Sequence, residues 1–218
     1  MKRLLEYAIS FLVVVLLFPM TSNAQTIKRP KQKTKTEKTQ KQNNQSPAKK
    51  RATNEFEGLT ANQIAKIGLD YEFGGHGKTQ DYTKAVKWYR KAAELGDDWA
   101  QWKMGECYKY GRGVAKDYYE AVKWYRKAAE QGDPWNQRTL GDCYYNGFGV
   151  TQDYYEAVKW YRKAANQGNE FGQISLAKCY YYGHGVTKNL DEAKSLLLKA
   201  IAQGSNDAKT YMRNWFGE

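Results

Sequence analysis

The sequence predicts an all-α protein, a solenoid in which about four pairs of helices stack side by side. A nine-residue stretch, Ala-Val-Lys-Trp-Tyr-Arg-Lys-Ala-Ala, begins identically at residues 85, 121 and 157, and a degenerate copy begins at 193. The copies are therefore 36 residues apart. A fixed period of about 20 to 50 residues is typical of stacked units, none of which can bury its apolar face alone. Within each unit, apolar and small residues also recur at helical spacing.

The first 24 residues are predicted to be a secretory signal peptide, residues 1–24. Two basic residues precede the largely apolar run Ala8–Phe18, and a step of small residues ends at Ala24. This order is typical of a leader that is cleaved, here after Ala24. The alternative is an uncleaved membrane anchor, but a spanning helix needs about 20 apolar residues. We therefore expect the mature protein to be exported, to a bacterial periplasm or beyond the cell.

Residues 25–56 are expected to form a disordered basic linker. Ten basic residues and one acidic residue lie between positions 25 and 54, which gives this stretch +9 of the chain's net charge of +12. Almost no apolar residue follows Ile27, so the stretch cannot offset the entropy lost on ordering. The linker is either a soluble spacer or a tether to anionic glycans or lipids. Nucleic acid is not an expected partner, because the linker has no aromatic residue on which bases could stack.

The second unit, residues 98–133, shows how a first helix is specified. Asp97 or Asp98 can cap its start, since short polar side chains accept hydrogen bonds from the first free backbone N–H groups. Met104 belongs to an apolar face with helical spacing, and Gly111 can end the helix in a left-handed conformation.

A second helix follows a short turn in the same unit. Asp117 is expected to cap it, with Glu120 three residues later completing a capping box. Gly132 can close it, and Pro134 fits the first position of the next helix. We expect Gly105 and the alanines to let helix backbones approach closely, while tyrosine and tryptophan rings fill the seams.

The folded part of the chain, residues 57–218, divides by this pattern into four units and an end cap. The first unit carries one extra glycine, at Gly74 or Gly75, so its first helix is one residue out of register. The predicted units are 61–97, 98–133, 134–169 and 170–205, and the predicted capping helix lies within 206–218.

Two matched strings carry a family resemblance: Met104-Gly105-x-x-Tyr108-x-x-Gly111-x-Gly113-Val114-x-x-Asp117 and Ala121-x-x-Trp124-Tyr125-x-Lys127-Ala128-Ala129-x-x-Gly132. This pattern resembles the Sel1-like repeat family, a relative of the tetratricopeptide repeats. The resemblance implies a right-handed α/α superhelix that serves mostly as a scaffold for protein complexes, often in bacterial envelope or host-contact roles. The fourth unit departs from the pattern, with Ala177 in place of glycine and Leu196-Leu197 in place of Trp-Tyr. Terminal units of a solenoid are expected to deviate.

The residues that could carry chemistry are better explained by structure. Cys107, Cys143 and Cys179 recur 36 residues apart, and neighbouring helices pack about 8 to 10 Å apart, too far for disulfides. We therefore expect buried thiols and no disulfide. The cysteine-rich branch of the family has two cysteines per repeat, so its reported hydrolase activity is not implied. His76 and His184 fall in inter-helix turns of distant units and cannot share a metal ion.

No enzyme, cofactor or metal site is therefore expected, and a cell-wall or β-lactam hydrolase is only a remote alternative. Gly74-Gly-His-Gly-Lys-Thr79 looks like the end of a phosphate-binding loop but lacks the required first glycine and a preceding strand. No serine or cysteine stands near a histidine in a triad-like order.

A partner-binding surface is predicted where the repeats differ from one another. Positions needed for stacking should recur between units, whereas positions that face a partner are free to vary. In tetratricopeptide-like solenoids the variable stripe of the first helix lines the concave groove. The stripe mixes aromatic, basic and acidic groups, as interaction surfaces do; neutral variation on a wet surface is the alternative. The predicted residues are Trp99, Trp102, Glu106, Lys109, Tyr110, Trp135, Arg138, Asp142, Tyr145, Ile174, Lys178, Tyr181 and Tyr182.

The leading hypothesis is thus an exported, non-catalytic scaffold of the bacterial cell envelope, which binds a protein or peptide through the concave face. The alternative is a surface tether whose basic linker binds anionic glycan or lipid, with the solenoid as passive cargo. A monomer is expected in both cases.

Overall fold

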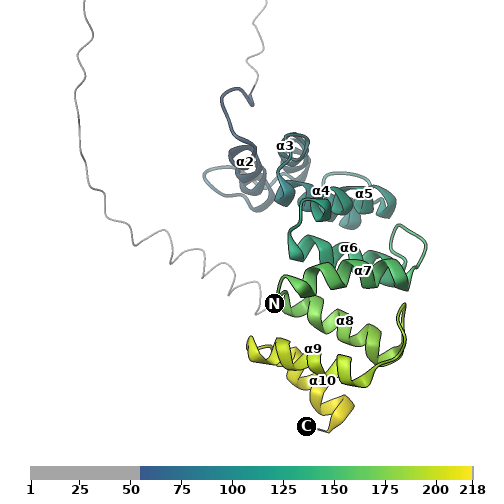
Figure 1. Ribbon diagram of the computed structural model, residues 1–218. Helices are drawn as coiled ribbons and strands as arrows, with labels where there is room; N and C mark the ends of the chain where they lie inside the picture. Colours follow the sequence, from purple (N-terminus) through teal and green to yellow (C-terminus); the bar gives the residue numbers. More distant parts are fainter. Residues whose placement is uncertain (1–54, 218) are drawn as a thin grey trace, which may run out of the picture. The chain divides into compact units, whose positions relative to one another are not determined.

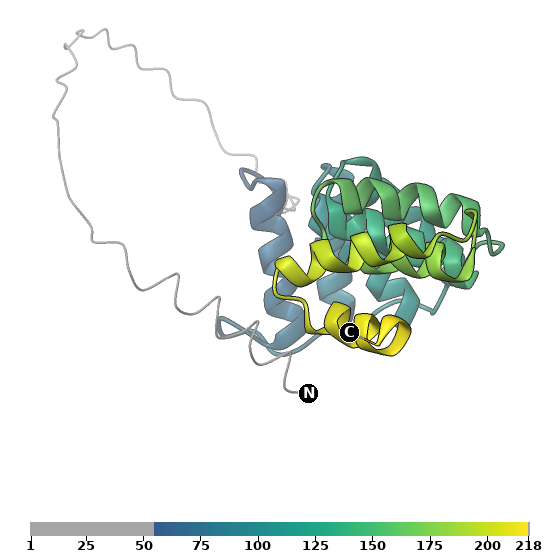
Figure 2. The same cartoon turned by 60° about the horizontal axis from the view of Figure 1, so that its bottom comes forward.

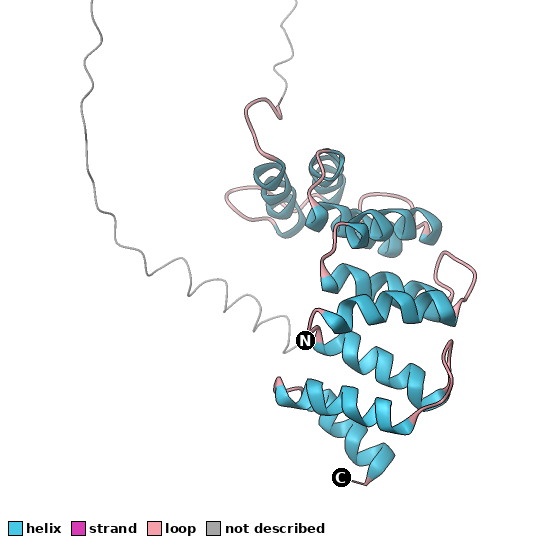
Figure 3. Ribbon diagram, in the orientation of Figure 1, coloured by secondary structure: helices cyan, strands magenta, loops and turns pink. Residues whose placement is uncertain are grey.

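The computed structural model describes residues 55–217, and these residues form helices and connecting turns without a strand (Figures 1 and 3). They belong to one compact unit, Ala52–Glu218. The predicted signal peptide and the predicted linker up to residue 54 lie outside the described residues. The all-α repeat architecture is confirmed for the described part. Within that part, no helix has the length and apolar character needed to cross a membrane.

Helices in the described residues alternate as first and second members of successive pairs. Each has 13 residues except the last, which has 11. The first helices are α2 (Ala61–Phe73), α4 (Asp98–Tyr110), α6 (Pro134–Asn146), α8 (Glu170–Tyr182) and α10 (Asn206–Phe216). The second helices are α3 (Tyr82–Glu94), α5 (Tyr118–Glu130), α7 (Tyr154–Asn166) and α9 (Leu190–Ala202).

Polar caps and glycines set the helix boundaries at equivalent places in each pair. The carboxylate of Asp97 accepts a hydrogen bond from the backbone N–H of Ala100 at 2.7 Å and so starts α4. Gly111 ends the same helix with a φ of 68°, in the left-handed region that favours glycine. The start and stop that the sequence predicts for this helix are therefore confirmed.

The capping box predicted at Asp117 and Glu120 is half wrong. Asp117 does cap α5, because its carboxylate accepts from two backbone N–H groups of the first turn, at 2.9 and 3.0 Å. However, the N–H of Asp117 donates to the carbonyl of Tyr108 at 2.9 Å, which ties the turn back to α4. Since that donor is already used, the carboxylate of Glu120 pairs with Lys123 instead.

Within the pairs, a tyrosine ring of the second helix lies directly on a glycine of the first. A Cβ atom added at Gly141 would stand 2.6 Å from Cδ1 and Cε1 of Tyr161, well inside van der Waals contact. In the fourth pair the same two positions are Ala177 and Leu197. Alanine thus replaces the glycine in the unit in which a narrower leucine replaces the opposing tyrosine. The departure of the fourth unit is a matched exchange in the packing.

Glutamine side chains at one repeat position join neighbouring pairs. At the end of α5, Nε2 of Gln131 donates to the carbonyl oxygen of Gly96 in the preceding unit at 2.9 Å, and to Oε1 of Gln101 in its own unit at 2.9 Å. One unit further on, Gln167 makes the same two bonds, to Gly132 at 3.0 Å and to Gln137 at 2.9 Å. The equivalent residue of the first unit is Leu95, and no pair of helices precedes that unit in the described residues. The polar brace is therefore present where there is a neighbouring unit to bind.

Both ends of the stack are covered. At the first pair, the ring of Phe56 packs edge-on against Trp88, with ring centroids 4.8 Å apart. At the other end, α10 lies against α9, as the yellow segment in Figure 2 shows, and buries Ala208 and Met212 in the last core cluster. The first helices α6 and α8 also contact each other directly. We call the side of the stack that the first helices form its inner side, and the side that the second helices form its outer side.

Candidate functional site

Most of the predicted stripe is accessible on the inner side of the first helices. Of its 13 positions, 12 are partly or fully exposed. The prediction of Ile174 as a binding residue is wrong: its side chain is only 5% exposed and belongs to the same core cluster as Ala208 and Met212. This variable position is therefore part of the core at the C-terminal end of the stack.

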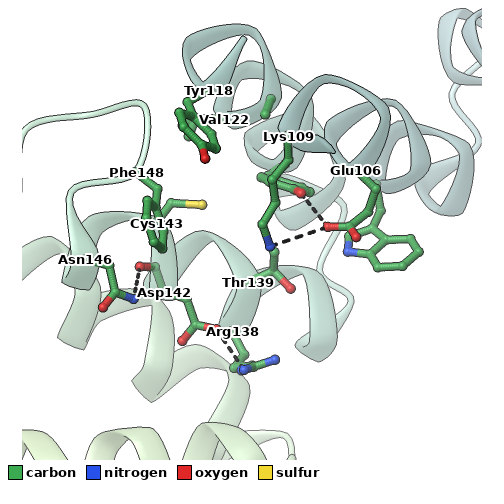
Figure 4. Close-up of a pocket in the computed structure, with 13 residues that line it drawn as sticks. Glu106, Lys109, Tyr118, Val122, Arg138, Thr139, Asp142, Cys143, Asn146 and Phe148 are labelled. Atoms are coloured by element: carbon green, nitrogen blue, oxygen red, sulfur yellow. Dashed lines mark hydrogen bonds and ion pairs between the residues drawn. The ribbon is translucent and has the colours of Figure 1, made fainter. Parts of the chain in front are cut away.

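A cleft of about 260 Å³ lies between α4, α5 and α6 (Figure 4). Five predicted stripe residues line it, and they come from two different repeats. Thr139, Asn146 and Ala121 also line the cleft. Such a volume admits one or two side chains, since sites for drug-sized ligands are about 300 to 1,000 Å³. The five stripe residues are Trp102, Glu106, Lys109, Arg138 and Asp142.

Asp142 is the most constrained charged group of the cleft. Its carboxylate accepts a hydrogen bond from the hydroxyl of Tyr161 at 2.8 Å and forms an ion pair with Nη2 of Arg138 at 2.8 Å. Burial nevertheless raises the pKa of Asp142 above its ordinary value, although Arg138 and the Tyr161 hydroxyl act in the opposite direction. Burial and the same carboxylate also raise the pKa of Tyr161, which keeps its hydroxyl a donor.

Glu106 occupies the equivalent place one unit earlier. It accepts a hydrogen bond from the hydroxyl of Tyr125 at 2.5 Å, and Nζ of Lys109 lies 3.9 Å from the same carboxylate oxygen. Glu72 does the same for the first unit, accepting from the hydroxyl of Tyr89 at 2.5 Å and from Lys103 at 2.8 Å. Each of these carboxylates thus accepts a hydrogen bond from a tyrosine hydroxyl that is buried between the helices. Some acidic residues of the stripe are therefore explained by the interior of the protein and not by a partner.

Sequence reasoning missed Tyr118 and Phe148, which form the apolar end of the cleft together with Val122 and Cys143. Phe148 lies between the two glycines of a Gly-x-Gly turn, and its ring stacks on Tyr118 with centroids 5.9 Å apart. A Cβ atom at Gly149 would collide with the carbonyl oxygen of Tyr118. The second glycine therefore brings the turn onto the start of the preceding second helix.

The same stacking recurs along this edge of the solenoid. The middle residue of each Gly-x-Gly turn varies in identity, but in the second to fourth units it always has a planar group. The recurring signal that could have revealed these pairs is a tyrosine at the start of one second helix and a planar residue 30 positions later. The other pairs are Tyr82 with Arg112, at 5.9 Å, and Tyr154 with His184, at 4.4 Å.

The part of the stripe near the C-terminus is partly covered. Tyr181 stacks on Trp215 of the capping helix with centroids 4.1 Å apart, and Nζ of Lys178 lies 4.5 Å from the ring centroid of Tyr211. The hydroxyl of Tyr145 forms a hydrogen bond with Nδ1 of His184 at 2.8 Å. These residues are therefore held by the cap and by the last turn, whereas the cleft lies in the middle of the stack.

The remaining stripe residues are exposed rings at the margins of the inner side. Trp99 and Trp135 lie at helix starts, and each contacts an aromatic neighbour: Tyr89 at 5.7 Å for Trp99 and Phe171 at 5.0 Å for Trp135. Tyr110 and Tyr182 lie at helix ends and are about half exposed. They extend the accessible aromatic surface beyond the cleft.

The groups considered for catalysis lie where the sequence analysis placed them. The three cysteines are buried as free thiols, and burial raises the pKa of each to about 12. Residues 74–79 form the turn after α2, and a helix rather than a strand precedes them. Among residues 55–217, no group of three His, Cys, Asp or Glu side chains is placed to hold a metal ion.

Comparison with family models identifies the repeat. The model described as Sel1 repeat matches residues 64–97, 100–133, 137–169 and 171–205, more than half of the chain. A model described as sperm antigen HE2 matches residues 4–64, almost wholly outside the described part.

Comparison with known proteins gives the same result. A Sel1 repeat protein from Oxalobacter formigenes is 35% identical with a TM-score of 0.66, over 71% of this chain and 63% of that one. A protective antigen present in uropathogenic Escherichia coli strains, described as displaying an SLR fold, is 34% identical with a TM-score of 0.47, over 71% of this chain and 41% of that one. The ERAD-associated E3 ubiquitin-protein ligase component HRD3A from Arabidopsis thaliana is 43% identical over 51 residues, 23% of this chain and 8% of that protein. The chain thus spans less than two thirds of the length of each of these relatives.

Proposed function

Because the chain belongs to the Sel1-repeat family, we propose that it is an exported scaffold that binds a protein or peptide partner through the inner side of its solenoid. Sel1 repeats typically mediate protein–protein interaction, and the family is generally non-catalytic. The envelope location and the nature of the partner are part of the proposal.

The observation that carries the proposal is the cleft between α4 and α6. Side chains that differ from repeat to repeat come together there, although they are far apart in the sequence: Trp102 and Lys109 come from one unit, Arg138 and Asp142 from the next. A hollow with an apolar and a charged end, bordered by exposed rings, has the composition of a recognition site. The second helices α3, α5 and α7 instead carry nearly the same residues in the first three units, so their outer side gives a partner less to distinguish one repeat from another.

A pair of matched variants tests the placement. The inner variant Trp102→Ala/Tyr110→Ala should weaken a partner isolated from envelope extract by at least about tenfold, because buried aromatic anchors contribute about 2 kcal/mol or more. The outer control Tyr119→Ala/Tyr155→Ala removes two rings that are each 63% exposed and should leave the affinity unchanged. Affinity is measured by titration calorimetry on both variants after their melting curves have been compared. Loss of binding in the outer control alone would contradict the proposed placement.

Export is proposed from the N-terminal sequence and is tested separately. The mass of the protein recovered from its native compartment should correspond to a chain that begins at Gln25. Intact Met1 in mature protein from the envelope would argue for an anchor instead.

The ten basic residues between positions 25 and 54 support the tether as a second candidate function. Deleting residues 25–54 should then abolish association with anionic envelope fractions, and that association should fall steeply with added salt. Association that survives the deletion would refute the tether.

A further inference from the structure

The cleft between α4 and α6 has two chemically different ends. Tyr118, Val122, Cys143 and Phe148 make one end apolar. The charged end carries two carboxylates and two cations, and Figure 4 shows them on the facing helices α4 and α6. If a side chain of the partner fills the apolar end, the next residue of the partner's sequence therefore lies beside the charged end.

At the charged end, both carboxylates are already engaged. Glu106 accepts a hydrogen bond from the hydroxyl of Tyr125 at 2.5 Å, and Asp142 accepts one from the hydroxyl of Tyr161 at 2.8 Å. Asp142 also accepts from Arg138 at 2.8 Å. Partner cations would have to compete with these internal donors for the same oxygens.

Donor capacity, by contrast, is left over. A guanidinium group has five N–H donors, and Nε of Arg138 is buried without a hydrogen-bond partner among the described residues. Nζ of Lys109 is 3.9 Å from Glu106, beyond hydrogen-bond distance. Lys178 adds a third positive charge that acts on Asp142. The ammonium and guanidinium groups that line the cleft therefore have N–H donors that its two carboxylates do not take up.

We propose that this cleft recognises a partner segment in which a carboxylate stands next to an aromatic side chain. The ring enters the apolar end against Tyr118 and Phe148, and the carboxylate is received by the ammonium group of Lys109 and the guanidinium group of Arg138. This inference rests on the proposed function, because it names the chemistry of the partner at the same site.

The chain itself shows that this chemistry suits its surface. The carboxylate of Glu55 pairs with Lys87, and the adjacent ring of Phe56 packs on Trp88 with centroids 4.8 Å apart. Nζ of Lys87 and Nζ of Lys91 each lie 5.9 Å from the Phe56 ring centroid. An acidic–aromatic pair is thus held at the end of the stack by a lysine and an aromatic ring, the same kinds of group that the cleft offers.

Labelled probe peptides test the specificity on the full mature chain. The probe is an amidated, N-acetylated hexapeptide with a central Glu-Phe pair between glycines and serines. The comparison peptides replace Glu by Gln, Phe by Ala, or place Phe at a free C-terminus without the Glu. Fluorescence anisotropy should show binding of the Glu-Phe probe at least about tenfold tighter than of the Gln-Phe peptide, as expected for a charge-assisted hydrogen bond. If the free C-terminus binds as well as Glu-Phe, the site takes a terminal carboxylate rather than a side-chain one.

Variants of the chain connect the preference to the cleft. Arg138→Gln and Lys109→Gln should each reduce the difference between the Glu-Phe and Gln-Phe peptides by at least about threefold, whereas Arg213→Gln on the exposed side of α10 should leave it unchanged. Because Arg138 also pairs with Asp142, each variant is first checked for an unaltered melting curve, and Lys109→Gln alone decides the matter if Arg138→Gln does not fold.

Two results would overturn the inference. The first is no detectable binding of the Glu-Phe probe at concentrations up to about 1 mM, the dissociation constant of a very weak complex. The second is equal affinity for the Glu-Phe and Gln-Phe peptides. If instead a natural partner without an acidic–aromatic pair loses affinity in Trp102→Ala/Tyr110→Ala, the inference fails and the proposed function stands. If that partner is indifferent to all inner substitutions, both fail.

Discussion

Replacing Gly141 by alanine should destabilise the solenoid, although alanine is normally the better helix former. The added Cβ would lie 2.6 Å from two ring carbons of Tyr161 and 3.3 Å from the carbonyl oxygen of Ala157. The ring has little room to retreat, because it is 2% exposed and its hydroxyl is bonded to Asp142. Overpacking of this kind costs about 1 to 3 kcal/mol, and the gain in helix propensity offsets about 1 kcal/mol.

We therefore expect a net loss of up to about 2 kcal/mol, equivalent to a melting temperature lower by up to about 8 °C for a domain of this size. Thermal and urea unfolding followed by far-UV circular dichroism measure the change. The fourth unit supplies the matched rescue, since it has alanine and leucine at the two positions. Tyr161→Leu alone should cost about 2 to 4 kcal/mol through the cavity and the lost hydroxyl.

The double variant Gly141→Ala/Tyr161→Leu should be more stable than the sum of the single losses by at least about 1 kcal/mol, because the new methyl group fills part of the space left by the ring. Strictly additive losses, or a Gly141→Ala chain that is more stable than the parent, would refute the packing account.

Three further results are expected. Gln167→Ala should lower the free energy of unfolding by about 1 to 2 kcal/mol in urea titrations, since buried Gln137 loses its partner. Leu95→Ala, at the same repeat position but without these hydrogen bonds, should lower the free energy of unfolding by less. A larger loss in Leu95→Ala than in Gln167→Ala would contradict the stabilising role of the glutamine bonds. Burial raises the folded-state pKa of Asp142 above 3.8, so ionising this carboxylate weakens the fold: the penalty is absent below the unfolded pKa and complete above the folded one. Relative to the parent, Asp142→Asn should therefore gain stability as the pH rises from about 4 to 7, in unfolding titrations at both values; a relative loss would show that the pKa is lowered instead. The three buried thiols, whose pKa burial raises to about 12, should react with a disulfide reagent at pH 8 only at the rate of unfolding, and rapid labelling of native protein would contradict their burial.

Helix positions could be predicted from the sequence because their signals are local. Asp97 and Gly111 start and stop α4 through contacts within a few residues, and the 36-residue spacing extends each assignment to its copies. The half-wrong capping box shows the limit. Glu120 has the right spacing, but the N–H that it would accept from is taken by Tyr108, a residue of the other helix.

The candidate site was predicted only in part, for a similar reason. A comparison of the repeats identifies the positions at which they differ. It does not tell whether a side chain differs because it faces solvent or because the side chain that packs against it also differs. Ile174, for example, is buried in one core cluster with Ala208 and Met212 of α10. Tyr118 and Phe148 were missed because their stacking joins the start of one unit's second helix to the next unit's turn.

Hydroxyl-radical footprinting of the chain with and without its partner tests most directly whether recognition occurs on the inner side. Oxidation of Trp102, Tyr110 and Phe148 should fall when the partner binds, while that of Tyr119 and Tyr155, each 63% exposed on second helices, should not change. Protection of Tyr119 and Tyr155 with unaltered oxidation of the inner rings would contradict the account.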